Sequence, residues 1–370
     1  MHNMQGQSAA MRIVSSNMSA MGSPPLLPRL ASPSWLVAVA AYGEGKRTER
    51  RALVHSVGSM CRLGQQAALF VDAAAVTVGW WERLLAVEGC DEGLPCTRTG
   101  CVQHTHVRYH PETVGTLLTA QHMALFRANL DNFDWFLYSE DDIGWTPWSV
   151  MAWVAEFERL RHADFTPNDS KLHAVPGFIR WEARAAFNEL NVVDPNRLLP
   201  RALSSGVNQQ PLDRLIGNDL FFRLCVLPRI EAHDLSDRSS RYLEMCNPHQ
   251  AMWILPQKLL RAKLARLRWH VSEAEPPQLP PHARPQEWWG GGWLFRCPRQ
   301  RKLYQYCVPS QGMRKLVPCE RVCDFLVQHF GGKYSYGNGS EWMDLGVDGS
   351  ATLATALGNA CGRHLDRRCM

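Results

Sequence analysis

The chain has 370 residues, and its 40 Lys plus Arg against 35 Asp plus Glu give a formal net charge of only +5. This charge balance does not indicate a nucleic-acid-binding protein. Hydrophobic residues make up 45% of the sequence and charged residues 20%, which is enough apolar material for one large or two smaller α/β domains. No run of 18 apolar residues occurs, so the sequence shows no transmembrane helix.

The N-terminal segment, residues 1–34, contains Arg12 and Arg29, several serines and no acidic residue. Such a composition is more typical of an organelle transit peptide than of a secretory signal, because a secretory signal needs an apolar core. We expect residues 1–34 to be disordered or to act as a targeting peptide. A chain that lacks its true N-terminus, including a membrane anchor, would look the same.

The first folded elements follow a β-α-β pattern. Trp35 to Tyr42 is an apolar run that predicts a buried strand, residues 46–63 predict a helix, and Gln66 to Ala73 predicts a second strand. This spacing implies a parallel sheet with a right-handed crossover. Residues 88–110 are rich in Cys, His and Gly, and we expect a loop there. Their spacing contains no C-x₂-C pair, so a disulfide-tied loop is favoured over a zinc site.

The middle of the chain alternates between helices and strands. Residues 112–130 predict a helix, Trp135 to Ser139 a strand, and Pro147 begins a further helix that Thr146 can cap. The apolar stripe of that further helix consists of Val150, Trp153, Val154, Phe157 and Leu160. Later elements are predicted as one strand from Lys171 to Glu182, a strand from Met252 to Leu255, and a basic amphipathic helix over 256–270.

Three adjacent carboxylates, Glu140, Asp141 and Asp142, come directly after the predicted strand in "FLYSEDDIGW". In an open α/β sheet, ligands bind at the carboxyl ends of the strands. Acidic side chains in that place can hold a divalent cation that leaves positions open for phosphate oxygens. A solvated acidic loop, or acids placed near a helix N-terminus, would explain the same residues.

The segment "LYSEDDIGWTPWSVMAWVAEF" resembles the EDD version of the DxD motif in GT-A fold glycosyltransferases. It is similar to the family of GlcNAc transferases that process N-glycans, and to less characterised eukaryotic proteins with "YxEDDI". The later segments "HAVPGFIRWE", "CNPHQAMWIL", "PQEWWGGGW" and "FLVQHFGGKY" follow in the order that the resemblance requires. It implies a GT-A-like, Rossmann-like α/β fold with a mixed, mostly parallel sheet over 35–340, followed by a C-terminal tail at 341–370.

The resemblance also implies a set of site residues. Asp142 would be the main ligand to Mn²⁺ or Mg²⁺, Asp141 would support it, and Glu140 would lie nearer the ribose of the donor. His329 would be a third contact to the metal, although a histidine that serves only in packing explains it equally well. Tyr42 and Arg50, in the loop after the first strand, would contact the nucleotide.

An inverting transfer also needs a base within reach of the acceptor hydroxyl. Glu287, beside Trp288 and Trp289, is the first candidate for this base, and a carboxylate at the start of a helix is its alternative. Asp219 is the second candidate. The chain has 14 tryptophans, and most of them are expected to be core residues. Any that are exposed could also form platforms for sugar rings.

The sequence thus predicts a metal-dependent glycosyltransferase with a nucleotide-sugar donor, UDP-linked as first choice, and a glycan or glycoprotein acceptor. A metal-dependent phosphoesterase and a non-catalytic glycan-binding protein on the same fold are the alternatives. Twelve cysteines, several in loop-like sequence, suggest an oxidising compartment. Together with the resemblance they favour the Golgi or another secretory lumen, whereas the acid-free N-terminus favours an organelle.

Overall fold

The structure is a computed structural model, and its described residues are 12–16, 33–41, 66–74, 102–110, 118–141, 143–145, 147–161, 174–181, 232–235, 238–244, 251–266, 288–295, 312–329 and 361. The chain divides into two compact units, and each combines two separate segments of the sequence. Unit 1 consists of Met1–Asp141 and Ala251–Gly290, and unit 2 of Asp142–Gln250 and Gly291–Met370. Both units fall largely within the span 35–340, for which we predicted one domain.

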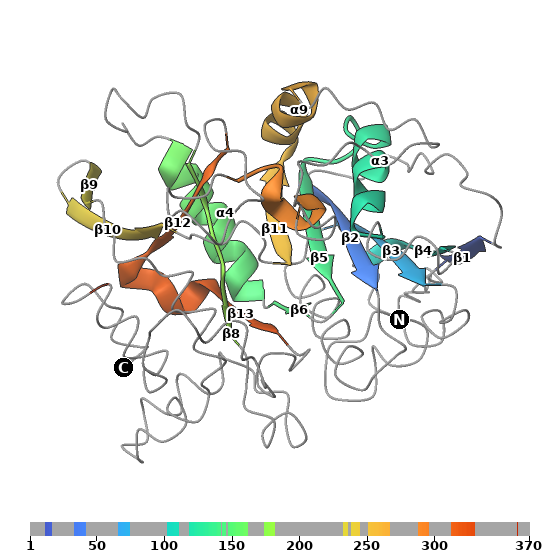
Figure 1. Cartoon of the computed structure of the whole chain (residues 1–370), viewed down its shortest axis with the longest axis horizontal. Helices are drawn as coiled ribbons and strands as arrows, with labels where there is room; N and C mark the ends of the chain where they lie inside the picture. Colours follow the sequence, from blue (N-terminus) through green and yellow to red (C-terminus); the bar gives the residue numbers. More distant parts are fainter. Residues whose placement is uncertain are drawn as a thin grey trace, which may run out of the picture. The chain divides into compact units, whose positions relative to one another are not determined.

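Unit 1 contains a six-stranded sheet whose strands lie in the order β1-β4-β3-β2-β5-β11 (Figure 1). All neighbouring pairs are parallel except β11 with β5, which is antiparallel. The prediction of an α/β fold with a mixed, mostly parallel sheet is therefore confirmed. In sheet order the strands are Arg12–Ser16, Val102–His110, Gln66–Ala74, Ser34–Ala41, Trp135–Glu140 and Met252–Pro256.

The sheet of unit 1 is buried because its central strands are apolar on both faces. Every residue of β2 is buried, as expected for a strand between parallel neighbours that is covered on both sides. Helix α3, Gln121–Ala128, packs against the sheet through Phe126, whose ring meets Phe136 and Trp253 edge-on. Helix α9, Gln257–Arg266, follows β11 and buries Leu260 and Leu264. Its exposed face is basic, as the sequence predicted.

Unit 2 contains two small sheets, ordered β7-β12-β10-β9 and β6-β13-β8, and the long helix α4. Helix α4 spans Pro147–Arg161 and begins at the proline that we predicted as its first residue. Four of the five predicted stripe residues, Val150, Trp153, Phe157 and Leu160, are buried. The strands β6 to β10, β12 and β13 are Ile143–Gly144, Ala174–Pro176, Ile179–Trp181, Ala232–Leu235, Arg238–Glu244, Arg314–Pro318 and Leu326–His329.

Two short helical segments complete the described elements. Cys319–Phe325 forms the 3₁₀ segment η5, which connects β12 to β13. Trp288–Gly292 forms a single turn, η4, at the "WWGGG" sequence. Cys361, within the predicted C-terminal tail, forms a disulfide with Cys319 across a sequence separation of 42.

The loop that we predicted over 88–110 is wrong for residues 102–110, which form β4. The alternation in "HVRYH" explains the strand: Val107 and Tyr109 are buried on one face, while Arg108 and His110 lie on the other, where they bind Asp72. Similarly, five residues of the N-terminal segment expected to be disordered, Arg12–Ser16, form β1. They pair in parallel with β4 and so satisfy their backbone groups at the sheet edge.

The single strand predicted from Lys171 to Glu182 is also wrong, because the structure has two strands, β7 and β8, in different sheets. The break falls at Gly177 and Phe178, where the chain passes from β7, which pairs with β12, to β8, which pairs with β13. Of the helix predicted at 112–130, the structure describes residues 118–130, which form a 3₁₀ turn at 118–120 followed by α3. The predicted helix at 46–63 lies outside the described residues.

Candidate functional site

The strand order of unit 1 contains a topological switch point between β2 and β5. The chain runs from β2 to β3 and then to β4 on one side, and it returns to place β5 on the other side of β2. Connections that leave two adjacent parallel strands in opposite directions open a crevice at their carboxyl ends, where α/β sheets bind ligands. In this sheet Ala40 of β2 lies in register with Glu140 of β5. The acidic segment therefore begins at the switch point.

The backbone of Glu140 and Asp141 is held by both neighbouring strands. The N–H of Asp141 donates to the carbonyl of Ala40 at 3.1 Å, and the N–H of Glu140 donates to the carbonyl of Ala251 at 2.8 Å. Asp141 is only 4% exposed, and Glu140 is half-buried. The prediction that these two acids stand at the carboxyl end of a sheet strand is confirmed.

Ala251, which receives the Glu140 hydrogen bond, has a left-handed backbone conformation with φ of 56°. For a residue with a Cβ this conformation costs about 1–2 kcal/mol, and such outliers concentrate at functional sites. Ala251 is fully buried and directly precedes β11, the antiparallel neighbour of β5. Backbone strain and the acidic strand end thus occur at the same edge of the sheet.

In unit 2, strand β6 follows Asp142 directly and pairs with β13. In this antiparallel ladder Ile143 lies opposite His329, and Gly144 lies opposite Gln328. The ladder brings the backbone of His329 to the residue that comes after Asp142 in the sequence. Asp142 itself and the His329 side chain lie outside the described residues, so their part in a metal site remains a prediction. Among the side chains that the structure describes, no three His, Cys, Asp or Glu form a group that could hold a metal.

A second polar cluster, which we did not predict, lies on β3 and β4. Asp72 is 2% exposed, and its Oδ1 accepts hydrogen bonds from Nε of Arg108 at 2.8 Å and from Nε2 of His110 at 2.6 Å. Burial alone would raise the pKa of Asp72, but the positive charge of Arg108 and the hydrogen bond to His110 outweigh burial and lower that pKa. Asp72 and Arg108 pair in register with each other, and Asp72 pairs in register with Ala40, so these residues share one face with Glu140.

The sequence held two signals for this cluster. A lone aspartate interrupts the apolar run "ALFVDAAA", and a buried charge of this kind needs a partner. The alternation in "HTHVRYH" supplies basic side chains every second residue. We read residues 88–110 by their Cys and His content and missed the period of two.

The remaining candidate residues, Tyr42, Arg50, Asp219 and Glu287, lie outside the described residues, and their roles stay predictions. Among the tryptophans whose side chains the structure describes, Trp35, Trp145, Trp153, Trp253 and Trp293 are at most 5% exposed, and Trp135 is partly buried and stacks on Trp35, so none of them is an exposed platform for a sugar. Within the described residues, no helix has both the length and the apolar character needed to cross a bilayer.

Comparison with known proteins gave no family model that matches this chain and no curated protein with a similar sequence. The fold places the chain among α/β proteins with a mostly parallel sheet, and its strand-end acids lie at the edge where sheets of this class generally bind ligands.

Proposed function

We propose that the chain is a metal-dependent glycosyltransferase of the GT-A type, which transfers a sugar from a nucleoside diphosphate donor to a hydroxyl of a glycan or glycoprotein. UDP is the first choice for the nucleotide. One observation carries the proposal: Glu140 ends β5 at the switch point of a mostly parallel sheet, and Asp141 and Asp142 follow it in the chain. This is where an α/β sheet binds a nucleotide.

The donor atoms at this edge fit a hard divalent cation. Carboxylate oxygens are the ligands that Mg²⁺ and Mn²⁺ prefer, and an imidazole such as that of His329 suits Mn²⁺ better than Mg²⁺. When bound, the cation would neutralise the charge that develops on the departing diphosphate. The contribution of the chain is to hold the carboxylates in place, which the backbone hydrogen bonds of Glu140 and Asp141 to Ala251 and Ala40 do.

The acceptor hydroxyl would transfer its proton to Glu287, or to Asp219, as the sugar is transferred. We further propose a secretory-pathway lumen as the location. The disulfide between Cys319 and Cys361 supports it, because disulfides form and persist mainly in oxidising compartments.

The test is a screen of nucleotide-sugar donors for release of UDP or GDP, with Mn²⁺ and with EDTA, in the presence of glycoprotein acceptors. We expect release that requires Mn²⁺ and falls by about 100-fold or more in Asp142→Asn, since that variant loses charge where the transition state gains it. Asp131→Asn is the matched control, because Asp131 is 80% exposed, and it should keep full activity.

Three outcomes would contradict the proposal. Free phosphate or a cleaved nucleotide as product would indicate a phosphoesterase. Glycan binding with every donor inert would indicate a non-catalytic glycan-binding protein. Full metal-dependent transfer by Asp142→Asn would show that the metal site is elsewhere.

A further inference from the structure

Helix α4 begins five residues after Asp142, and its placement in unit 2 is fixed along its length. Its apolar face is buried, and Nε1 of Trp153 donates to the carbonyl of Pro176 on β7 at 2.8 Å. A charged residue on the buried side does not fit this apolar pattern. Glu156 has no solvent exposure at all. A buried carboxylate is costly unless its oxygens are bound, so its partners decide what it does.

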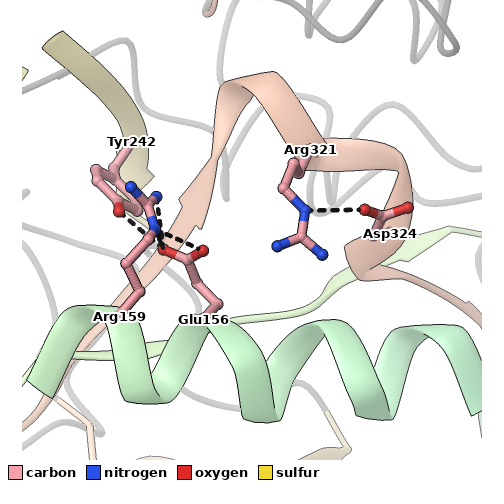
Figure 2. A network of polar contacts seen from close by, with 5 residues as sticks. All are labelled: Glu156, Arg159, Tyr242, Arg321 and Asp324. Carbon is pink, nitrogen blue, oxygen red and sulfur yellow. Dashed lines mark hydrogen bonds and ion pairs between the residues drawn. The ribbon is translucent and has the colours of Figure 1, made fainter. Parts of the chain in front are cut away.

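Glu156 is bound from two elements, as Figure 2 shows. The hydroxyl of Tyr242, on β10, donates to Oε1 of Glu156 at 2.8 Å. The guanidinium of Arg159, one turn along α4, lies 2.8 Å from Oε1 through Nη2 and donates from Nε to both oxygens at 3.0 Å. Arg159 also lies over the Tyr242 ring, 5.2 Å from its centre. The three side chains form one contact, which we call the Glu156 network.

The Glu156 network keeps Tyr242 protonated and Arg159 charged. Burial, followed by the negative charge of Glu156, raises the pKa of Tyr242, so the phenol stays protonated and donates. Burial alone would lower the pKa of Arg159, but the hydrogen bonds and charge of Glu156 outweigh it and raise that pKa. Tyr242 in turn packs in a small apolar cluster with Leu160 and Leu316. Helix α4 is thereby bound to the sheet that contains β10 and β12.

Segment η5 extends this contact toward His329. It packs against both α4 and β10, and its Glu320 acts electrostatically on Arg159 and Tyr242. Arg321 and Asp324 form an ion pair of 3.1 Å within η5, and the disulfide from Cys319 to Cys361 ties its first residue. Strand β13 follows η5 immediately and ends at His329.

These contacts close a ring of elements within unit 2. Strand β6 and helix α4 follow Asp142, the Glu156 network joins α4 to β10, η5 packs against both of these elements, and η5 leads to β13. Strand β13 then pairs with β6, with His329 opposite Ile143. The Asp142 segment therefore leads into α4, which the Glu156 network joins to β10, and the His329 segment follows η5, which packs against both of these elements.

We propose that Glu156 is a positioning residue. Through its contacts with Tyr242 and Arg159 it fixes the positions of α4 and η5. These two elements in turn position the segments that contain Asp142 and His329, the predicted ligands of the metal. The inference rests on the proposed function. An apolar side chain of similar volume in place of a buried ion pair often gives equal or greater stability. A carboxylate with directed bonds to two elements instead defines one geometry. Groups that hydrogen-bond to metal ligands typically change metal affinity by about 10–100-fold, and the Glu156 network acts one step further out, so we expect an effect at the lower end of that range.

The experiment measures Mn²⁺ binding to the full-length chain by electron paramagnetic resonance, at a temperature where circular dichroism shows every variant to be folded. We expect Glu156→Gln to weaken Mn²⁺ binding by about tenfold, and Tyr242→Phe to weaken it in the same direction. The double variant should lose less than the product of the two single effects, because both act through one contact.

Two control variants separate positioning from charge and from stability. Glu158→Gln makes the same charge change on α4 at a half-exposed position, where Glu158 pairs only with Arg161 among the described residues. Leu243→Ala removes a buried side chain next to Tyr242 on the opposite face of β10 and lowers stability without touching the network. Both should bind Mn²⁺ as tightly as the unmodified chain.

The results distinguish this inference from the proposed function. If the unmodified chain does not bind Mn²⁺, or if Asp142→Asn binds it equally well, the proposed metal site fails and the inference fails with it. If the unmodified chain binds Mn²⁺ but Glu156→Gln and Tyr242→Phe bind it with the same affinity, only the positioning role is wrong. If Leu243→Ala weakened Mn²⁺ binding equally, the Glu156 network would contribute to stability only, and the positioning role would again be wrong.

Discussion

At the scale of single residues, His122 is the clearest case of a side chain whose environment sets its ionisation. It lies on α3, is 2% exposed, and its ring lies 4.2 Å from that of Tyr138, with Phe126 and Trp253 also in contact. Burial lowers the pKa of His122 from 6.5 to about 3, although the negative charge of Asp72 acts in the opposite direction. The folded chain therefore keeps this imidazole neutral at every pH near neutrality.

This lowered pKa predicts a loss of stability in mild acid. Below pH 6.5 the unfolded chain protonates His122 while the folded chain does not, so the unfolding free energy falls as the pH falls. Between pH 7 and pH 5 the loss is about 2 kcal/mol, since each pH unit below 6.5 costs about 1.4 kcal/mol. The His122→Phe variant should lose about 2 kcal/mol less than the unmodified chain over this range, as measured by urea unfolding at each pH.

The control for this prediction is Phe126→Leu, which alters the packing around His122 but leaves the imidazole in place. Its pH dependence should match that of the unmodified chain at a lower overall stability. If the unmodified chain and His122→Phe lose equal stability between pH 7 and pH 5, His122 is not held neutral. Asp72 does not affect this comparison. A carboxylate whose pKa is lowered in the folded state changes the unfolding free energy only in solutions more acidic than the range from pH 7 to pH 5.

At the scale of elements, the disulfide between Cys319 and Cys361 predicts a large effect from a small change. Both cysteines are fully buried, and the bond closes a loop across 42 residues of sequence. A cross-link of that length typically stabilises a protein by about 2–4 kcal/mol, chiefly by restricting the unfolded chain. Cys361→Ser should lose stability of this order in guanidinium unfolding, and peptide mapping without reduction should find Cys319 joined to Cys361 in the unmodified chain.

Two further variants sharpen this prediction. Cys319→Ser should lose as much as Cys361→Ser, and the double variant should lose no more than either, because all three lack the same bond. Losses that add in the double variant, or free thiols at both positions in the unmodified chain, would show that the bond does not form.

Elements with a continuous apolar run or a clear stripe could be predicted from the sequence. Strands β2, β3, β5 and β11 each carry such a run, and α4 combines a stripe with the proline that begins it. In these segments the local pattern and the final environment agree. The end of β5 was also predictable, because three acids after an apolar run cannot continue a buried strand without partners.

Elements whose stability comes from distant partners could not be predicted in this way. Strand β4 depends on Asp72 to accept hydrogen bonds from Arg108 and His110, which lie 36 and 38 residues further along the chain. Strand β1 depends on β4, and the break between β7 and β8 depends on their different partner strands, β12 and β13. The Glu156 network was missed for the same reason, since Tyr242 lies 86 residues from Glu156.

At the scale of the whole molecule, the boundaries between the two units fall at particular places in the sequence. The chain passes from unit 1 to unit 2 between Asp141 and Asp142, inside the acidic segment, and it returns between Gln250 and Ala251. Ala251 accepts the hydrogen bond from Glu140 and has the left-handed backbone. The first passage thus falls among the acids that the proposed function assigns to the donor and the metal, and the first return falls next to the residue that binds the backbone of Glu140.

A ligand at these residues should stabilise the folded chain as a whole. At a free concentration 100 times its dissociation constant, a ligand that binds only the folded state raises the unfolding free energy by about 2.7 kcal/mol. Glu140, Asp141 and Asp142 repel a diphosphate unless a cation lies between them. We therefore expect UDP alone to leave the melting temperature unchanged, and UDP with Mn²⁺ to raise it in a concentration-dependent way. The shift should vanish with EDTA and in Asp142→Asn but persist in Asp131→Asn. An equal shift from UDP without any metal would mean that the nucleotide binds away from the acids, for which the basic face of α9 is the first place to search.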